Sequence, residues 1–438
     1  MRRILAIAAI CLSVTASAQN GGWTLSQCID YALEHNLSVK QSGLNVEQQE
    51  IALNTAESSR LPGLSGSAGQ NFSFGRGLTA DNTYANTNTT STSFSLGGDM
   101  TIFNGNRIKN NIEMSNLDLK AATAELDRAK DDIKVAVAQA YVQILYNQEI
   151  LEVAENQVDI DAVQVERLKE MAANGKASRA EVSAQEATLA QSRVSVTQAE
   201  NNLKLAVLDL TQLLELSSPE GFSIVRPAAE VLQTGLLMNP EQIFEEAVAV
   251  KPVIKSEEIR LDQALKNIDI AKGSFLPSVS MSAGLGTNFY TSSGYESNPF
   301  FTQLKNNFSQ YFGLNLNVPI FTRFSNRNQL KTARLSVQNQ EIQLENTKKQ
   351  LFKEIQQAYY NALGAREKYR SCEVAAKSAQ DAFELAQAKY ESGKSGITEY
   401  NEAKGRYVSA QSNLVQARYE NLYQSKLLDF YRGLELAF

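Results

Sequence analysis

A glycine turn near the end of the chain is flanked by residues that could act on charged solutes. Glu399 and Glu402 follow Gly393 at a helical i, i+3 spacing, which places both carboxylates on one face of a helix. Tyr390 precedes the same glycine. Carboxylates held together in this way raise the local concentration of cations and repel anions. Alternatively, the two glutamates only solvate an exposed helix face.

Motifs for catalysis and cofactor binding are incomplete. Gly393-Lys394-Ser395 resembles the end of a phosphate-binding loop, but Ala388 stands where that loop needs its first glycine, and a helical pattern precedes it. His35 is the single histidine, so metal sites built from several histidines and histidine proton relays have little to work with. The sequence therefore predicts no enzyme, no cofactor and no catalytic or metal site.

The composition indicates an exported protein. Residues 1–18 begin with Arg2-Arg3, continue as an apolar run and end on small residues, which is the pattern of a cleaved signal peptide. The formal net charge is −6 and no basic block occurs, which argues against a nucleic-acid partner. Cys28 and Cys372 lie far apart in the chain, so unpaired thiols are favoured over a disulfide.

Four segments alternate strictly between apolar and small polar residues, and no apolar run after the signal reaches the roughly 18 residues of a membrane-spanning helix. We expect strands at about 64–75, 91–103, 276–289 and 308–321, with outward-facing loops at 76–90 and 291–307. These lengths suit tilted strands that cross a bilayer, although soluble half-buried hairpins share the pattern. The apolar positions are Leu64, Ala68, Phe72, Phe74, Phe94, Leu96, Met100, Ile102, Val279, Met281, Ala283, Leu285, Phe289, Phe308, Phe312, Leu314, Leu316, Val318 and Ile320.

The rest of the chain is predicted to be helical, and the chain as a whole contains an internal repeat of two similar halves. Each half has a helix that ends before a Leu-Pro, two strands, a very long helix, a glycine turn at Gly175 or Gly393, and a return helix. Phe103 and Phe321 are separated by the same number of residues as the two glycines. The sequence therefore predicts a first structural repeat at 19–237, ending in an equatorial segment, and a second at 238–438.

The strand number predicts an oligomer. Four amphipathic strands would leave unpaired backbone groups at both edges, which lipid does not tolerate. Three copies would supply twelve strands and a lumen wide enough for an aqueous path.

Taken together, these features resemble the TolC-like outer-membrane efflux proteins. The resemblance is carried by the duplicated layout, the strand starts Leu61-Pro62 and Leu276-Pro277, the Ile-Phe strand ends, and the glycine turns followed by Glu181 and Glu399. It implies a mixed α/β membrane protein: a trimeric channel-tunnel whose shared 12-stranded outer-membrane β-barrel, with four strands per chain, continues as a long periplasmic α-helical barrel of coiled-coil hairpins.

The resemblance also implies function and partners. We expect a homotrimer in the bacterial outer membrane, in contact with its lipid and extending into the periplasm. It would be the exit duct of a tripartite efflux or type I secretion system, working with a periplasmic adaptor (membrane fusion protein) and an inner-membrane transporter. Drugs, metals and proteins all remain possible substrates. An exported periplasmic coiled-coil scaffold or adaptor without a channel is the alternative.

Individual residues acquire roles by the same resemblance. Tyr390, Glu399 and Glu402 match residues that narrow the periplasmic entrance, and Glu181 matches the acidic partner of an arginine that ties the closed tip. Ser395 replaces that arginine here, and Lys394 or Arg179 are candidates to substitute for it. Phe103 and Phe321 would mark the periplasmic rim of the barrel. The tip turns that would meet the adaptor are Asn174, Gly175, Lys176, Ser392, Gly393 and Lys394.

Overall fold

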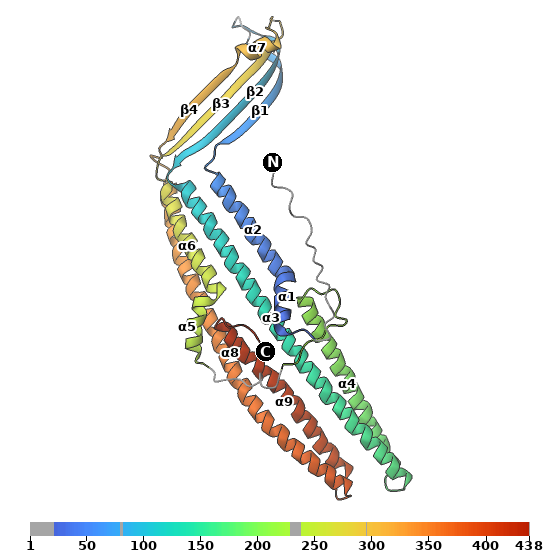
Figure 1. Ribbon diagram of the computed structural model, residues 1–438. Coiled ribbons are helices and arrows are strands. Elements are labelled where there is room, and N and C mark those ends of the chain that lie inside the picture. Colours follow the sequence, from blue (N-terminus) through green and yellow to red (C-terminus); the bar gives the residue numbers. More distant parts are fainter. Residues whose placement is uncertain (1–21, 79–81, 228–237, 295, 438) are drawn as a thin grey trace. The chain divides into compact units, whose positions relative to one another are not determined.

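The computed structural model describes residues 22–78, 82–227, 238–294 and 296–437 (Figure 1). The predicted signal peptide and residues 228–237 of the equatorial segment lie outside the described residues. The chain divides into two compact units, one built from 43–125 and 253–347, the other from 1–42, 126–252 and 348–438. Each unit therefore combines segments from both sequence repeats.

The first unit contains a four-stranded antiparallel sheet in the order β1-β2-β3-β4 (Figure 1). Its strands are β1 Gly63–Leu78, β2 Tyr84–Asn104, β3 Ser278–Ser292 and β4 Ser309–Asn317. The central β2–β3 ladder joins the two repeats, because β2 comes from the first and β3 from the second. β1 and β4 lie at the edges of this sheet.

The alternating residues separate onto two faces, as the sequence predicts. Leu96 lies opposite Leu285, Met281 opposite Leu314, and Val279 opposite Leu316, and directly paired residues of an antiparallel sheet share a face. Leu314 and Leu316 remain 64% and 63% exposed. The sheet thus presents an uncovered apolar face in the chain as described.

Several strand boundaries differ from those expected. β4 ends at Asn317 rather than 321, because Pro319 has no backbone N–H and β3, which begins at Ser278, offers no partner further on. The β1–β2 hairpin continues to the pair Leu78–Tyr84, into residues expected as loop. Residues 86–90 are polar on both faces, so alternation does not reveal this part of the hairpin.

Two further features were not predicted. The register shifts between Thr101 and Phe103, so Ile102 is the extra residue of a β-bulge and Phe103 pairs with Val279 on the apolar face. In addition, a short helix, α7 Phe300–Asn306, interrupts the expected loop at 291–307.

Helices continue from the sheet within the same unit. Most of α2 Leu37–Ser58, nearly all of α6 Pro252–Gly273, and the first parts of α3 Arg107–Ala173 and α8 Ser325–Glu391 belong to it. The turn from β2 into α3 requires Gly105, since its φ is +69° and a Cβ there would lie 2.2 Å from the carbonyl oxygen of Gly273. This close approach explains the glycine that follows the strand end Ile102-Phe103-Asn104.

The second unit is helical. It contains α1 Leu25–His35, α4 Arg179–Leu213, α5 Pro240–Val250, α9 Ile397–Tyr431 and the remainders of α3 and α8. α3 and α8 have 67 residues each and α4 and α9 have 35 each, so the two repeats match in length. Among the described residues, no helix is long and apolar enough to cross a membrane.

A hydrophobic core closes this unit where α1, α3, α4 and α9 meet. Val137, Leu145, Leu210 and Leu422 are fully buried there. The hydroxyl of Tyr141 donates to the carbonyl of Val225 at 2.6 Å, and burial raises the pKa of this tyrosine above its usual range. This core fixes the base from which two helical hairpins, α3–α4 and α8–α9, extend.

Candidate functional site

The two hairpins end in the same type of turn. In the first, the N–H of Gly175 donates to the carbonyl of Ala172 and the N–H of Lys176 to that of Met171, at 3.0 and 2.8 Å. The second turn forms the equivalent two bonds, from the N–H groups of Gly393 and Lys394. Both glycines have φ near +70°, as a Schellman motif requires, and neither has an atom within 4 Å of its Cβ position. The predicted tip residues are exposed.

The helices that leave the two turns begin differently. Ser178 caps α4 in a capping box with Glu181, whose carboxylate accepts from the N–H and the hydroxyl of Ser178 at 2.6 and 2.9 Å. These bonds lower the pKa of Glu181. In the described part of the chain Glu181 forms no ion pair with Lys394 or Arg179. By contrast, the N-cap residue of α9 is Gly396, which has no side chain to form such a bond.

The predicted entrance residues lie near one another at the tip of the α8–α9 hairpin. Glu399 forms an ion pair with Lys389 at 3.6 Å, and Glu402 lies 4.0 Å from Arg406. Both glutamates are more than half exposed. Their carboxylates are therefore accessible to a passing solute and are only weakly held by exposed partners.

Tyr390 belongs to a cluster that the sequence did not predict, here called the tip cluster: Arg167, Tyr390, Glu391 and Tyr400. Arg167 of α3 forms an ion pair with Glu391 of α8 at 3.3 Å, and its guanidinium lies 5.3 Å from the centre of the Tyr390 ring. Tyr390 in turn packs on buried Tyr400 of α9. Burial raises the pKa of Tyr400 to about 12. Arg167 thus holds the α8–α9 tip against α3.

A buried ion pair lies further along the same helices. The Asp161 carboxylate on α3 is completely inaccessible and accepts from Lys404 of α9, which is itself buried. Gln185 and Ser192 of α4 donate to the same carboxylate at 3.0 and 2.6 Å, and Gln157 donates at 2.7 Å. This buried Asp161–Lys404 pair therefore connects both hairpins through one carboxylate.

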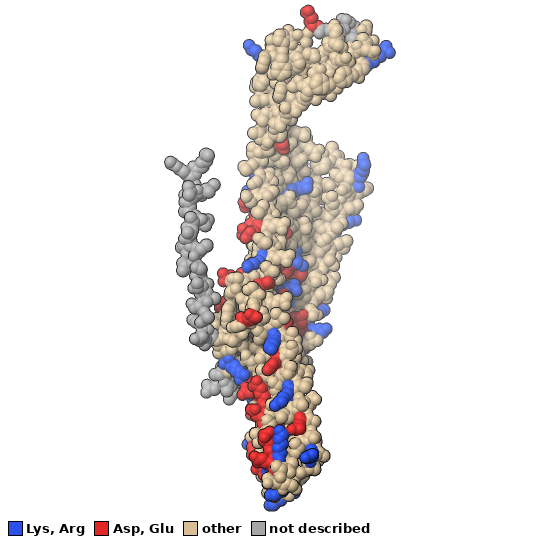
Figure 2. Space-filling model, turned by 90° about the vertical axis from the view of Figure 1, so that its right-hand side faces the viewer, with Lys and Arg blue, Asp and Glu red and all other residues tan. Residues whose placement is uncertain are grey.

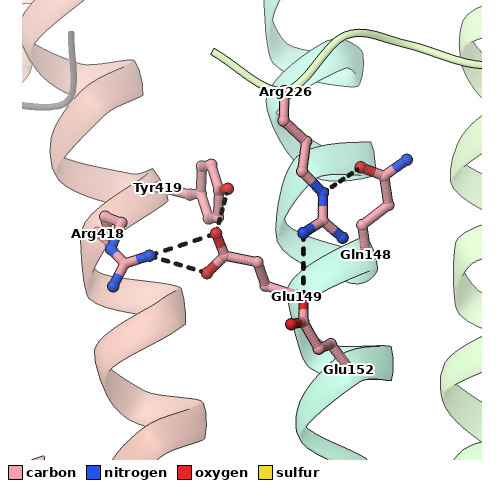
Figure 3. Close-up of polar contacts among 6 residues, drawn as sticks. All are labelled: Gln148, Glu149, Glu152, Arg226, Arg418 and Tyr419. Carbon is pink, nitrogen blue, oxygen red and sulfur yellow. Dashed lines mark hydrogen bonds and ion pairs between the residues drawn. The ribbon is translucent and has the colours of Figure 1, made fainter. Parts of the chain in front are cut away.

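A third contact is the Glu149 cluster (Figure 3). Arg418 of α9 donates to both carboxylate oxygens of Glu149 at 3.0 and 3.3 Å, and the hydroxyl of Tyr419 donates at 2.7 Å. Burial and this hydrogen bond raise the pKa of Tyr419. One turn away, Arg226 reaches from the segment after α4 to Glu152 at 3.1 Å and to Gln148 at 3.4 Å.

The tip cluster, the buried pair and the Glu149 cluster follow one another along α3. Each joins a side chain of the first repeat to the α8–α9 hairpin of the second. Sequence reasoning missed all three, although one signal was present: Asp161 interrupts the apolar seam between Val158 and Val165. A charge at a seam position needs a buried partner, but the sequence does not say which residue supplies it.

The two predicted rim residues lie where the sheet meets the long helices. Phe103 is in β2 at the bulge and is 39% exposed. Phe321 follows the end of β4, is 72% exposed, and packs edge-on against Phe324 at 5.6 Å. Their assignment to a membrane rim stays a prediction.

The chain supplies an amphipathic four-stranded sheet and paired helical hairpins of matching length, which are the elements of an outer-membrane channel with a barrel and a helical tunnel. Comparison with known proteins identifies the family. The model of the family described as outer membrane efflux protein matches residues 28–215 and 243–433. The chain therefore belongs to the outer membrane efflux protein family.

Individual relatives agree with this assignment. The chain is 25% identical to protein CyaE of Bordetella pertussis over 312 residues, which cover 68% of this chain and 62% of CyaE. It is 24% identical to the cation efflux system protein CusC of Escherichia coli K12 over 92% of this chain and 86% of CusC. A crystal structure of CusC superposes with a TM-score of 0.79 at 19% identity, covering 94% of each chain.

Family membership confirms the predicted fold class, the outer-membrane location and the role as an exit duct for efflux. It also decides against the alternative of a periplasmic scaffold without a channel.

Proposed function

We propose that three copies of this chain form one channel, the outer-membrane part of a tripartite efflux or type I secretion system. The observation that carries the proposal is the sheet: its apolar face is uncovered, and the outer sides of β1 and β4 have no partner strand within the described chain. Lipid can cover the apolar face, but it cannot satisfy the unpaired backbone groups at the strand edges. Pairing β4 of one copy with β1 of the next satisfies both edges in a closed ring of twelve strands.

In this assembly the polar sheet face and the hairpins enclose an aqueous path. The duct has no catalytic activity of its own, and an inner-membrane transporter supplies energy and selects the solute. A periplasmic adaptor joins the two. The exposed turns at Gly175 and Gly393 are the adaptor contacts, since they end the hairpins and the space around both glycines is open.

The α8–α9 tip forms the periplasmic gate. Glu399 and Glu402 of three copies would give two stacked rings of carboxylates around the axis, and Tyr390 would lie beside them. Arg167 takes the place of an arginine at position 395, because it contacts both Glu391 and Tyr390. Glu181 serves chiefly to cap α4, a role supported by its two bonds to Ser178.

The assembly is tested by membrane fractionation and electrophoresis. The processed protein should be recovered with outer membranes and run on SDS gels as a trimer that converts to monomer only on heating, since a closed barrel has no free edges. Recovery in the soluble periplasmic fraction as an SDS-sensitive monomer would contradict the proposal.

A further inference from the structure

The polar face of the sheet carries a single charged side chain. Within strands β1 to β4 the charged residues are Arg76 and Asp99. Arg76 lies on the apolar face, and its guanidinium lies over the ring of Tyr84 near the loop end of the strands. Asp99 lies between Gly63 and Ser282, on the face of serines, glycines and asparagines. Figure 2 shows how little charge the strand region has on the side in view, except at its loops.

The same face holds one aromatic ring laid against the backbone. Tyr311 of β4 lies opposite Gly284 of β3, and a Cβ at Gly284 would be 2.6 Å from its ring. Its hydroxyl reaches β2, 3.6 Å from the Cβ position of Gly97. Two glycines in register thus leave the space in which this ring lies across the sheet, and Tyr311 is still 60% exposed.

The tyrosine and the aspartate occupy nearby positions on the polar face. Gly97, beneath the tyrosine hydroxyl, is two residues from Asp99 on the same strand, and both face the same way. The Asp99 carboxylate extends toward Gly63, with an oxygen 3.6 Å from the Cβ position of that glycine. No side chain larger than serine stands at Gly63, Gly97, Ser282 or Gly284. Small uncharged residues therefore line the surface between the Tyr311 ring and the Asp99 carboxylate.

We propose that Tyr311 and Asp99 form a cation-binding site on the inner wall of the channel, selective for organic cations such as quaternary ammonium compounds and amines. The inference rests on the proposed trimer, in which the polar face lines the lumen and the site occurs three times around one ring. The carboxylate supplies charge and the tyrosine face supplies cation–π contact. This site lies in the sheet and is separate from the glutamates of the hairpin tip.

The test is single-channel recording of the purified trimer in planar bilayers, with tetrabutylammonium added from the outer side. We expect a preference for potassium over chloride and block by tetrabutylammonium. Asp99→Asn should reduce the preference and weaken block about tenfold, because three carboxylates are lost at one level of the pore. Tyr311→Leu should weaken block about two- to fivefold and leave the potassium preference intact, whereas Tyr311→Phe should retain block.

Controls separate this site from the gate and from folding effects. The Glu399→Gln and Glu402→Gln double variant should alter block from the periplasmic side and leave block from the outer side unchanged. Asp99→Ser repeats the charge removal with a residue typical of this face, and each variant is used only as an SDS-resistant trimer. Unchanged selectivity and block in both Asp99 variants would overturn the cation site. Absence of any channel in the parent protein would instead overturn the proposed assembly.

Discussion

At the residue scale, the buried Asp161–Lys404 pair is the contact whose loss should matter most. A carboxylate with no solvent exposure is stable only while its charge is neutralised and its oxygens are hydrogen-bonded. Here one lysine, one serine and two glutamines meet these needs from three helices. The helices can therefore separate at this level only by exposing the carboxylate to water or by leaving it unpaired.

Removing the lysine should destabilise the packing of α3 against α9. We expect Lys404→Met to cost about 3–5 kcal/mol locally, because Asp161 is left as an uncompensated buried charge, and the double variant Asp161→Leu with Lys404→Met to recover most of the loss. Hydrogen–deuterium exchange of residues 155–167 measures the effect.

A matched control is available on the same hairpin. Lys368 and Glu420 join α8 to α9 at 2.8 Å, but both side chains are 43% exposed. Lys368→Met should therefore change exchange by no more than about 1 kcal/mol. Equal effects of the Lys368 and Lys404 substitutions would show that burial does not determine the strength of these pairs.

At the scale of elements, the strands depend on strict alternation. Neighbouring positions of β4 point to opposite faces, so Leu314 is on the apolar face with Met281 and Asn315 is on the polar face with Ser280. A charge on the lipid side must be taken into hydrocarbon, whereas one on the lumen side stays in water.

This difference gives a paired prediction. Leu314→Lys should destabilise the barrel by up to about 2–4 kcal/mol if the residue lies near the bilayer midplane, while Asn315→Lys should be tolerated. The temperature at which the trimer band disappears from SDS gels measures both. Similar melting of the two variants would mean that the faces are assigned incorrectly.

The sequence predicted the helices and strands better than it predicted contacts between them. Hydrophobic periodicity located the long helices and the four strands, and two glycines located the hairpin turns, because each of these signals is local. The far end of the β1–β2 hairpin was missed, since Asn86, Thr87 and Asn88 are polar on both faces and give no alternating signal. The Ile102 bulge, Arg167 and Lys404 were missed because each depends on a partner distant in sequence.

At the scale of the whole molecule, the hairpin turns should determine which adaptor is captured. Lys176 and Lys394 follow the two turn glycines and are exposed, so bulky side chains there need no rearrangement within the chain. Lys176→Trp combined with Lys394→Trp should weaken cross-linking to the adaptor, while SDS-resistant trimers persist. Ser195→Trp, on the exposed side of α4 away from the turn, serves as the comparison. Undiminished cross-linking of the turn variant would exclude these residues from the contact.

The pairing of β2 with β3 has a consequence for the order of folding. The helical hairpins close between residues near in sequence, but Thr89 pairs with Ser292, about two hundred residues later. Contacts of such long range form slowly, because the loop between them must close first. The β1–β2 hairpin therefore keeps an unpaired β2 edge until β3 of the second repeat has been translocated. An unpaired strand edge favours aggregation, so the chain is vulnerable during this interval.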